Sequence, residues 1–130
     1  MIDLILLLFG LLLGIFIHEL GHYLMIKKLF PAVKTRINYF DPVALSEKGL
    51  FAYCVADLPK NIKLSQKRMI YYAGFYLETI FYLIICMTSL LFRRIDFALA
   101  FLIILFSRLI MGWNVLFGWF DDDAKNIFKE

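Results

Sequence analysis

Residues 14–22 read Gly14-Ile-Phe-Ile-His18-Glu19-Leu20-Gly21-His22 and lie inside a stretch that is otherwise apolar. In an α-helix, side chains four positions apart lie on one face, so His18 and His22 can share a metal ion while Glu19 reaches a water molecule bound to it. An ionisable residue at the centre of a membrane helix costs roughly 2.5–3.5 kcal/mol and tends to mark function. We therefore interpret His18 and His22 as zinc ligands and Glu19 as a catalytic residue, rather than as polar side chains satisfied by packing.

The composition indicates an integral membrane protein. Of the 130 residues, 62% are hydrophobic, and the mean hydropathy is +0.77. A soluble domain of this size would be far less apolar. The net charge of +3 arises from 14 basic and 11 acidic residues, and the basic ones gather at the ends of apolar segments. This grouping predicts a lipid bilayer as a partner and gives no indication of nucleic-acid binding.

Three apolar segments are long enough to cross a membrane as helices, at residues 2–26, 69–92 and 97–120. A helix needs about 20 residues to cross a hydrocarbon core of roughly 30 Å. We predict an all-α membrane protein with one intramembrane core, residues 1–130, and a small β-hairpin or strand insertion between the first two helices. The first segment carries Asp3 in place of a basic start and has no small-residue cleavage site, so we expect it to be retained.

The polar connection at residues 29–68 carries the predicted β-structure. Residues 33–40 alternate apolar and polar side chains, residues 50–56 are rich in strand-forming types, and turn residues separate them. An ordinary solvated loop is the alternative. Counted from Lys27, the basic residues up to the second span are Lys27, Lys28, Lys34, Arg36, Lys48, Lys60, Lys63, Lys67 and Arg68. The positive-inside rule then predicts a cytoplasmic loop and C-terminus, with the N-terminus outside, in the cell membrane.

The motif contains the only two histidines of the chain, so a further protein ligand must be Asp, Glu or Cys. A catalytic zinc ion has three protein ligands and one open position for water. The third span returns to the membrane face at which the first ends, and it is followed by Asp121, Asp122 and Asp123. Such a run can also be a solvated helix cap, but its expected depth favours one of the three as the ligand. Asn114, about two turns earlier, is placed to bind a peptide or to orient the metal site.

Two further charged residues, Glu78 and Arg108, lie within the second and third spans at similar expected depths. An unpaired charge inside a membrane is costly, so a structural ion pair between them is the simpler interpretation. The alternative is that Glu78 belongs to the water network of the active site.

This arrangement resembles the site-2 protease family of intramembrane zinc metalloproteases. The likeness lies in the His18–His22 motif of a first helix, a polar loop with strand character, and Asn114 followed eight positions later by Asp122. The family has an Asn-x-x-Pro segment before an Asp-Gly ligand at this spacing. The resemblance therefore implies Asp122 as the third zinc ligand, with Asp121 and Asp123 as register alternatives.

The same resemblance implies the activity: a zinc endopeptidase, with one Zn²⁺ per chain and Glu19 as the catalytic base. The expected substrate is a transmembrane or signal-peptide-like segment cut near the cytoplasmic face, with Asn114 in substrate binding. The chain departs from the family at Phe117, where the family has proline, and at residues 73–78, where it often has Gly-Pro and an Asn. The alternative is a catalytically inactive relative that binds membrane peptides or acts as a scaffold, and either version is compatible with a partner subunit or a homo-oligomer.

Overall fold

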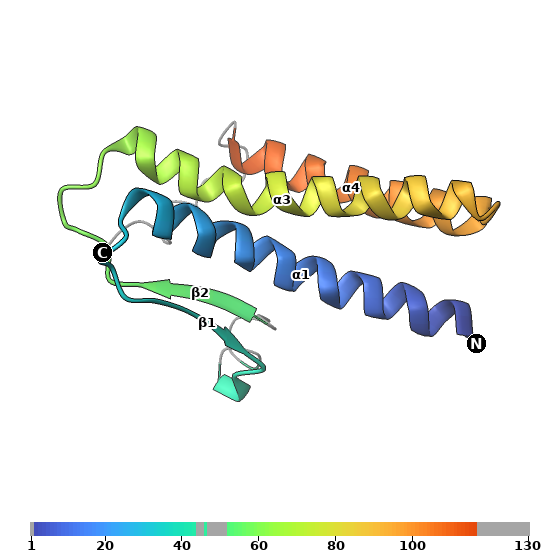
Figure 1. Ribbon diagram of the computed structural model, residues 1–130, viewed down its shortest axis with the longest axis horizontal. Helices are drawn as coiled ribbons and strands as arrows, with labels where there is room; N and C mark the ends of the chain where they lie inside the picture. The colour runs from blue at the N-terminus through green and yellow to red at the C-terminus, as the bar shows by residue number, and fades with distance from the viewer. Residues whose placement is uncertain (1, 44–45, 47–51, 117–130) are drawn as a thin grey trace. The chain divides into compact units, whose positions relative to one another are not determined.

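The computed structural model describes residues 2–43, 46 and 52–116, and of residues 2 and 111–116 it describes only the backbone. The described residues form, in order, α1 (Ile2–Leu29), β1 (Thr35–Tyr39), β2 (Ala52–Ala56), α3 (Leu64–Leu91) and α4 (Ile95–Leu116) (Figure 1). The mostly helical fold with a small antiparallel sheet confirms that part of the predicted fold class. Helices α1 and α3 are each long and apolar enough to cross a membrane, whereas a crossing by α4 stays a prediction.

The chain divides into two compact units, Met1–Phe81 and Tyr82–Glu130, and the division falls within α3. The first unit holds α1, the sheet and the first part of α3, and it contains the His-Glu-x-x-His motif. The second unit holds the end of α3 and α4. The single core over residues 1–130 stays a prediction.

The ends of the helices follow local chemistry. Helix α1 continues past the predicted end at residue 26 to Leu29, and its last turn holds Lys27 and Lys28, where cations interact favourably with the helix dipole. The Lys27 Nζ donates a hydrogen bond to the Val33 carbonyl, 2.8 Å away, and so ties the following turn to the helix. Helix α3 begins before the predicted residue 69, and the Gln66 side chain accepts a bond from the Lys63 amide at 3.1 Å, as in half of a capping box.

Strands β1 and β2 pair antiparallel, with Thr35 opposite Ala56 and Tyr39 opposite Ala52. The small sheet expected between the first two helices is thereby confirmed, and its strands lie inside the predicted ranges, residues 33–40 and 50–56. Beyond β1, Asp41 links the chain that follows the strand to β2. Its carboxylate accepts hydrogen bonds from the Val43 amide at 3.0 Å and from the Tyr53 hydroxyl of β2 at 2.6 Å.

The sheet lies along α1 rather than away from it (Figure 1). The Phe16 ring meets the rings of Tyr39 and Phe40 edge to face, with centroids 4.9 and 5.9 Å apart. Along α1, Phe16 lies about 20 Å from Leu29, the last residue of the helix, at 1.5 Å per residue. The motif, residues 18–22, lies between these two positions. The sheet therefore runs along α1 past the motif and lies beside it.

In the second unit, α3 turns directly into α4. Arg93 has a φ of 57°, and its amide bonds to the Leu90 carbonyl at 2.9 Å, while the Arg94 amide bonds to the Ser89 carbonyl at 2.8 Å. These two bonds and the left-handed residue form a Schellman motif, which satisfies the last carbonyls of α3. Arginine occupies the position that glycine usually takes.

Candidate metal centre

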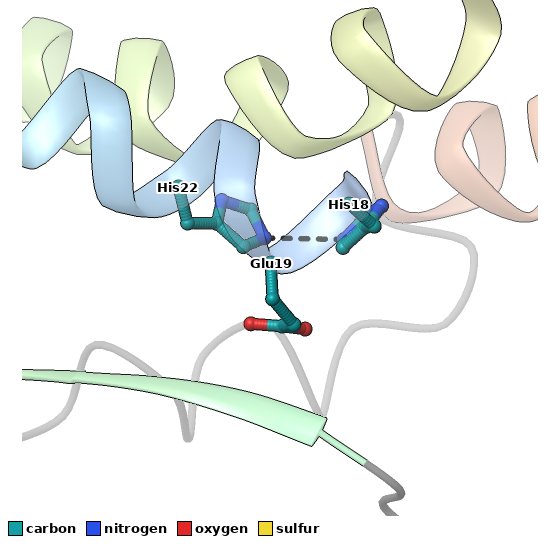
Figure 2. A group of neighbouring side chains, drawn as sticks. All are labelled: His18, Glu19 and His22. Atoms are coloured by element: carbon teal, nitrogen blue, oxygen red, sulfur yellow. Dashed lines mark hydrogen bonds between the residues drawn. The ribbon is translucent and has the colours of Figure 1, made fainter. Parts of the chain in front are cut away.

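The side chains of His18 and His22 converge on one point, as their spacing predicts. Their Nε2 atoms lie 3.1 Å apart, and the rings are nearly perpendicular, with centroids 4.7 Å apart (Figure 2). Both residues lie on α1, one helical turn apart, so the helix itself sets the separation.

Each histidine is oriented through its other ring nitrogen by a residue of α3. The His22 Nδ1 donates to the Ile70 carbonyl oxygen at 2.7 Å, and the His18 Nδ1 lies 2.8 Å from a carboxylate oxygen of Glu78. A carbonyl or carboxylate oxygen can only accept, so each Nδ1 carries a proton, and in the neutral form of each ring the other nitrogen, Nε2, is an acceptor. Both Nε2 atoms then present lone pairs to each other. Two acceptors this close repel unless a cation lies between them, and metal-bound histidines are held in this way.

The separation suits zinc. Two Zn–N bonds of about 2.0–2.1 Å at a tetrahedral angle place the two nitrogen atoms roughly 3.3–3.4 Å apart. The observed 3.1 Å between the Nε2 atoms differs from this by about 0.2–0.3 Å, which a small ring rotation supplies. The nitrogen donors and their spacing therefore fit a zinc ion.

Glu19 lies beside the histidine pair but on the side of the sheet. Ligand atoms of His18, Glu19 and His22 all lie within 4.8 Å of one another, and the Glu19 carboxylate points towards β2 (Figure 2). Its charge acts on β2, where burial and, secondly, the Glu19 carboxylate raise the pKa of the Cys54 thiol from 9.0 to about 11. Glu19 thus lies between the histidines and the sheet, within reach of a water molecule at the pair.

Helix α3 approaches the motif closely through two glycines. A Cβ atom on Gly21 would collide with the backbone of Ala73 and lie 2.8 Å from the Gly74 Cα. A Cβ atom on Gly74 would lie 2.7 Å from the His22 Nε2 and 2.9 Å from the His18 Nε2. Small residues permit such close packing of helices, and here the packing places the α3 backbone directly against the Nε2 atoms of His18 and His22.

The other predicted site residues fall elsewhere. Asp121, Asp122 and Asp123 lie outside the described residues, so the third ligand stays a prediction. Asn114 lies within α4, but its side chain is outside the described part of the chain, and its role also stays a prediction.

Glu78 has a partner that the sequence did not indicate. Its side chain is 2% exposed, and it contacts His18. Arg108 is half-buried in α4, within the second unit. The ion pair between Glu78 and Arg108 stays a prediction. The contact with His18 supports the alternative interpretation, in which Glu78 belongs to the site.

Three contributions from α3 were missed from the sequence: the Ile70 carbonyl, the space at Gly74, and the Phe75 ring, which packs edge to face on His18 with centroids 4.6 Å apart. A signal for one of them, the space at Gly74, exists in the sequence. Gly74 and Glu78 are four positions apart and so share a face of an apolar helix, and a small residue with a polar one on that face indicates a helix contact. A backbone carbonyl leaves no such signal.

Comparisons with known proteins give no relative. No protein-family model matches the chain, and no curated protein or solved structure is significantly similar to it. The likeness to site-2 proteases therefore stands on the motif residues alone.

Proposed function

We propose that this protein is a zinc-dependent endopeptidase that cuts a transmembrane or membrane-tethered peptide. One observation carries the proposal: two histidine Nε2 atoms converge at 3.1 Å, with each Nδ1 held by an acceptor. This pair lies in a helix that is long and apolar enough to cross a membrane, and a glutamate lies beside it. A purely structural metal site, shielded from water, needs no glutamate beside its ligands, whereas a hydrolase needs one as its general base.

In this proposal, His18 and His22 hold one Zn²⁺ together with a third ligand from the terminal aspartates, Asp122 first and Asp121 or Asp123 as alternatives. When bound, the ion lowers the pKa of a water molecule and polarises the scissile carbonyl. Glu19 accepts the proton of that water and returns it to the leaving amine. The Nδ1 bonds keep both rings in the tautomer that this ligand set requires.

The sheet suits an extended substrate. Among the described residues each strand pairs with one neighbour only, so a further strand can join through backbone hydrogen bonds. A helical segment hides its peptide bonds and must unwind before it is cut, and pairing with the sheet would stabilise the unwound form. Because the sheet runs beside Glu19, a segment paired there would lie next to the catalytic residues, with Asn114 as a further contact.

We further place the protein in the cell membrane, with the N-terminus outside and the basic loop and C-terminus in the cytoplasm. The cluster of lysines and arginines in residues 27–68 supports this orientation. Cleavage then occurs near the cytoplasmic face, since His22 lies only about 10 Å along the helix from Leu29.

The test uses the full chain reconstituted in lipid vesicles with a set of synthetic single-span peptides, and mass spectrometry detects the fragments. Glu19→Gln should retain its zinc content and lose about 10²–10⁴-fold in cleavage rate, because the general base is lost while the ligands remain. The control Leu24→Val, on an exposed face of the same helix, should cleave as the wild type does. Removal of zinc with a chelator should stop cleavage, and re-addition should restore it.

Two results would contradict the proposal. One is cleavage by Glu19→Gln at the wild-type rate. The other is zinc-loaded wild type that binds the peptides but cuts none of them, which would favour the non-catalytic binding or scaffold function.

A further inference from the structure

Glu78 is the one buried charged residue among the described residues, with 2% of its side chain exposed. It lies in α3, a helix long and apolar enough to cross a membrane. Burial of a carboxylate costs several kcal/mol, and replacement of a buried charge by an apolar residue is often neutral or stabilising. Stability alone therefore gives little reason for a glutamate here. Its contact with the His18 Nδ1 at 2.8 Å gives a functional one.

The contact decides which nitrogen of His18 carries the proton. With Glu78 as the acceptor, Nδ1 keeps the proton and Nε2 keeps its lone pair. In the other tautomer, the His18 Nε2 would donate directly to the His22 Nε2, which lies 3.1 Å away. That hydrogen bond would join the two rings and use the electron pairs that a metal ion needs. The Ile70 carbonyl already keeps the proton of His22 on Nδ1, so His18 is the ring whose tautomer decides the outcome.

We propose that Glu78 is a positioning residue that acts through His18: its carboxylate prevents a direct histidine–histidine hydrogen bond and keeps both Nε2 atoms open to a metal ion. This inference rests on the proposed metal site. Gly74 lies one turn before Glu78 on the same face of α3 and leaves room for the rings. Phe75 packs against the His18 ring at right angles, so ring orientation and protonation are both set from α3.

The test separates the charge of Glu78 from its hydrogen bond. Glu78→Gln keeps an acceptor oxygen but loses the charge, and Glu78→Leu loses both. Ile80→Val, on an exposed face of the same helix, is the matched control. Circular dichroism and size-exclusion chromatography in detergent show whether each variant is folded.

The first measurement needs no metal. The chain has 2 histidines, so ¹⁵N chemical shifts of the ring nitrogens report each tautomer in the metal-free protein. Wild type should show His18 protonated at Nδ1, and Glu78→Leu should shift His18 towards protonation at Nε2. A purely structural role for Glu78 would leave the tautomer of a folded variant unchanged.

The second measurement is zinc affinity, from competition with a chromophoric chelator. Glu78→Leu should lose about 10–100-fold in affinity and Glu78→Gln less, as expected when an outer-shell partner of a metal-bound histidine is removed. The proposal is overturned if folded Glu78→Leu keeps the wild-type tautomer, or if Glu78→Gln and Glu78→Leu both bind zinc as tightly as wild type. If wild type binds zinc no better than His22→Ala, the metal site itself is wrong, and the tautomer measurement still decides the role of Glu78.

Discussion

Replacement of Gly74 by alanine is the sharpest available test of how α3 meets the candidate metal centre. The added Cβ would lie 2.6 Å from the His22 Cε1, 2.7 Å from the His22 Nε2 and 2.9 Å from the His18 Nε2. Ordinary contact distances for such atoms are about 3.5–4.0 Å. Each ring must therefore move by about 0.6–0.9 Å, or α3 must move away from α1 by a similar amount.

The expected effects follow from these displacements. Overpacking of a close helix contact costs about 1–3 kcal/mol of stability. Metal–ligand distances tolerate only about 0.2 Å, so a shift several times larger should lower zinc affinity by more than tenfold. In an ordinary helix interior the same substitution is stabilising by about 1 kcal/mol, because alanine is the better helix former. The sign of the stability change therefore distinguishes a collision at Gly74 from a simple helix-propensity effect.

The assay combines unfolding in mixed detergent micelles with zinc competition, for Gly74→Ala beside wild type. Tyr76→Phe is the control, since Tyr76 is 71% exposed on the same helix, and it should change neither quantity. A Gly74→Ala protein that is more stable than wild type and binds zinc equally well would refute the described packing of the rings against α3.

Two further predictions concern other parts of the chain. At pH 8 the Cys54 thiol should react with iodoacetamide about 100-fold more slowly than a thiol of pKa 9.0, because its pKa of about 11 leaves it almost fully protonated. Mass spectrometry of the Cys54 peptide follows the reaction, and the rate should rise about tenfold per pH unit up to about pH 11. Glu19→Gln should speed this reaction, since loss of the neighbouring charge lowers the thiol pKa, and an unchanged rate would contradict their proximity. Arg93→Gly should raise stability by about 0.5–1 kcal/mol, because glycine adopts the left-handed conformation of residue 93 without the steric cost that arginine bears. Thermal unfolding in detergent measures this change, and the control Arg93→Ala should give no gain. A loss of stability in Arg93→Gly would count against this account.

The secondary structure of the first unit was predictable because it depends on local patterns. The first apolar segment became α1, and the alternation in residues 33–40 and the strand-forming run in residues 50–56 became β1 and β2. Helix ends were less predictable. Helix α3 starts at Leu64 rather than residue 69, because a glutamine cap and polar first turns extend a helix beyond its apolar part.

By itself, the sequence determined that His18 and His22 lie together, because their spacing within one helix fixes their common face whatever surrounds them. Only the tertiary structure decided what orients that pair. The Ile70 carbonyl, the close approach at Gly74 and the contact of Glu78 with His18 all come from another helix, at sequence separations of 48 residues or more. The physical reason is that helical periodicity relates residues within about a turn of one another, whereas contacts between helices depend on packing that no single segment encodes.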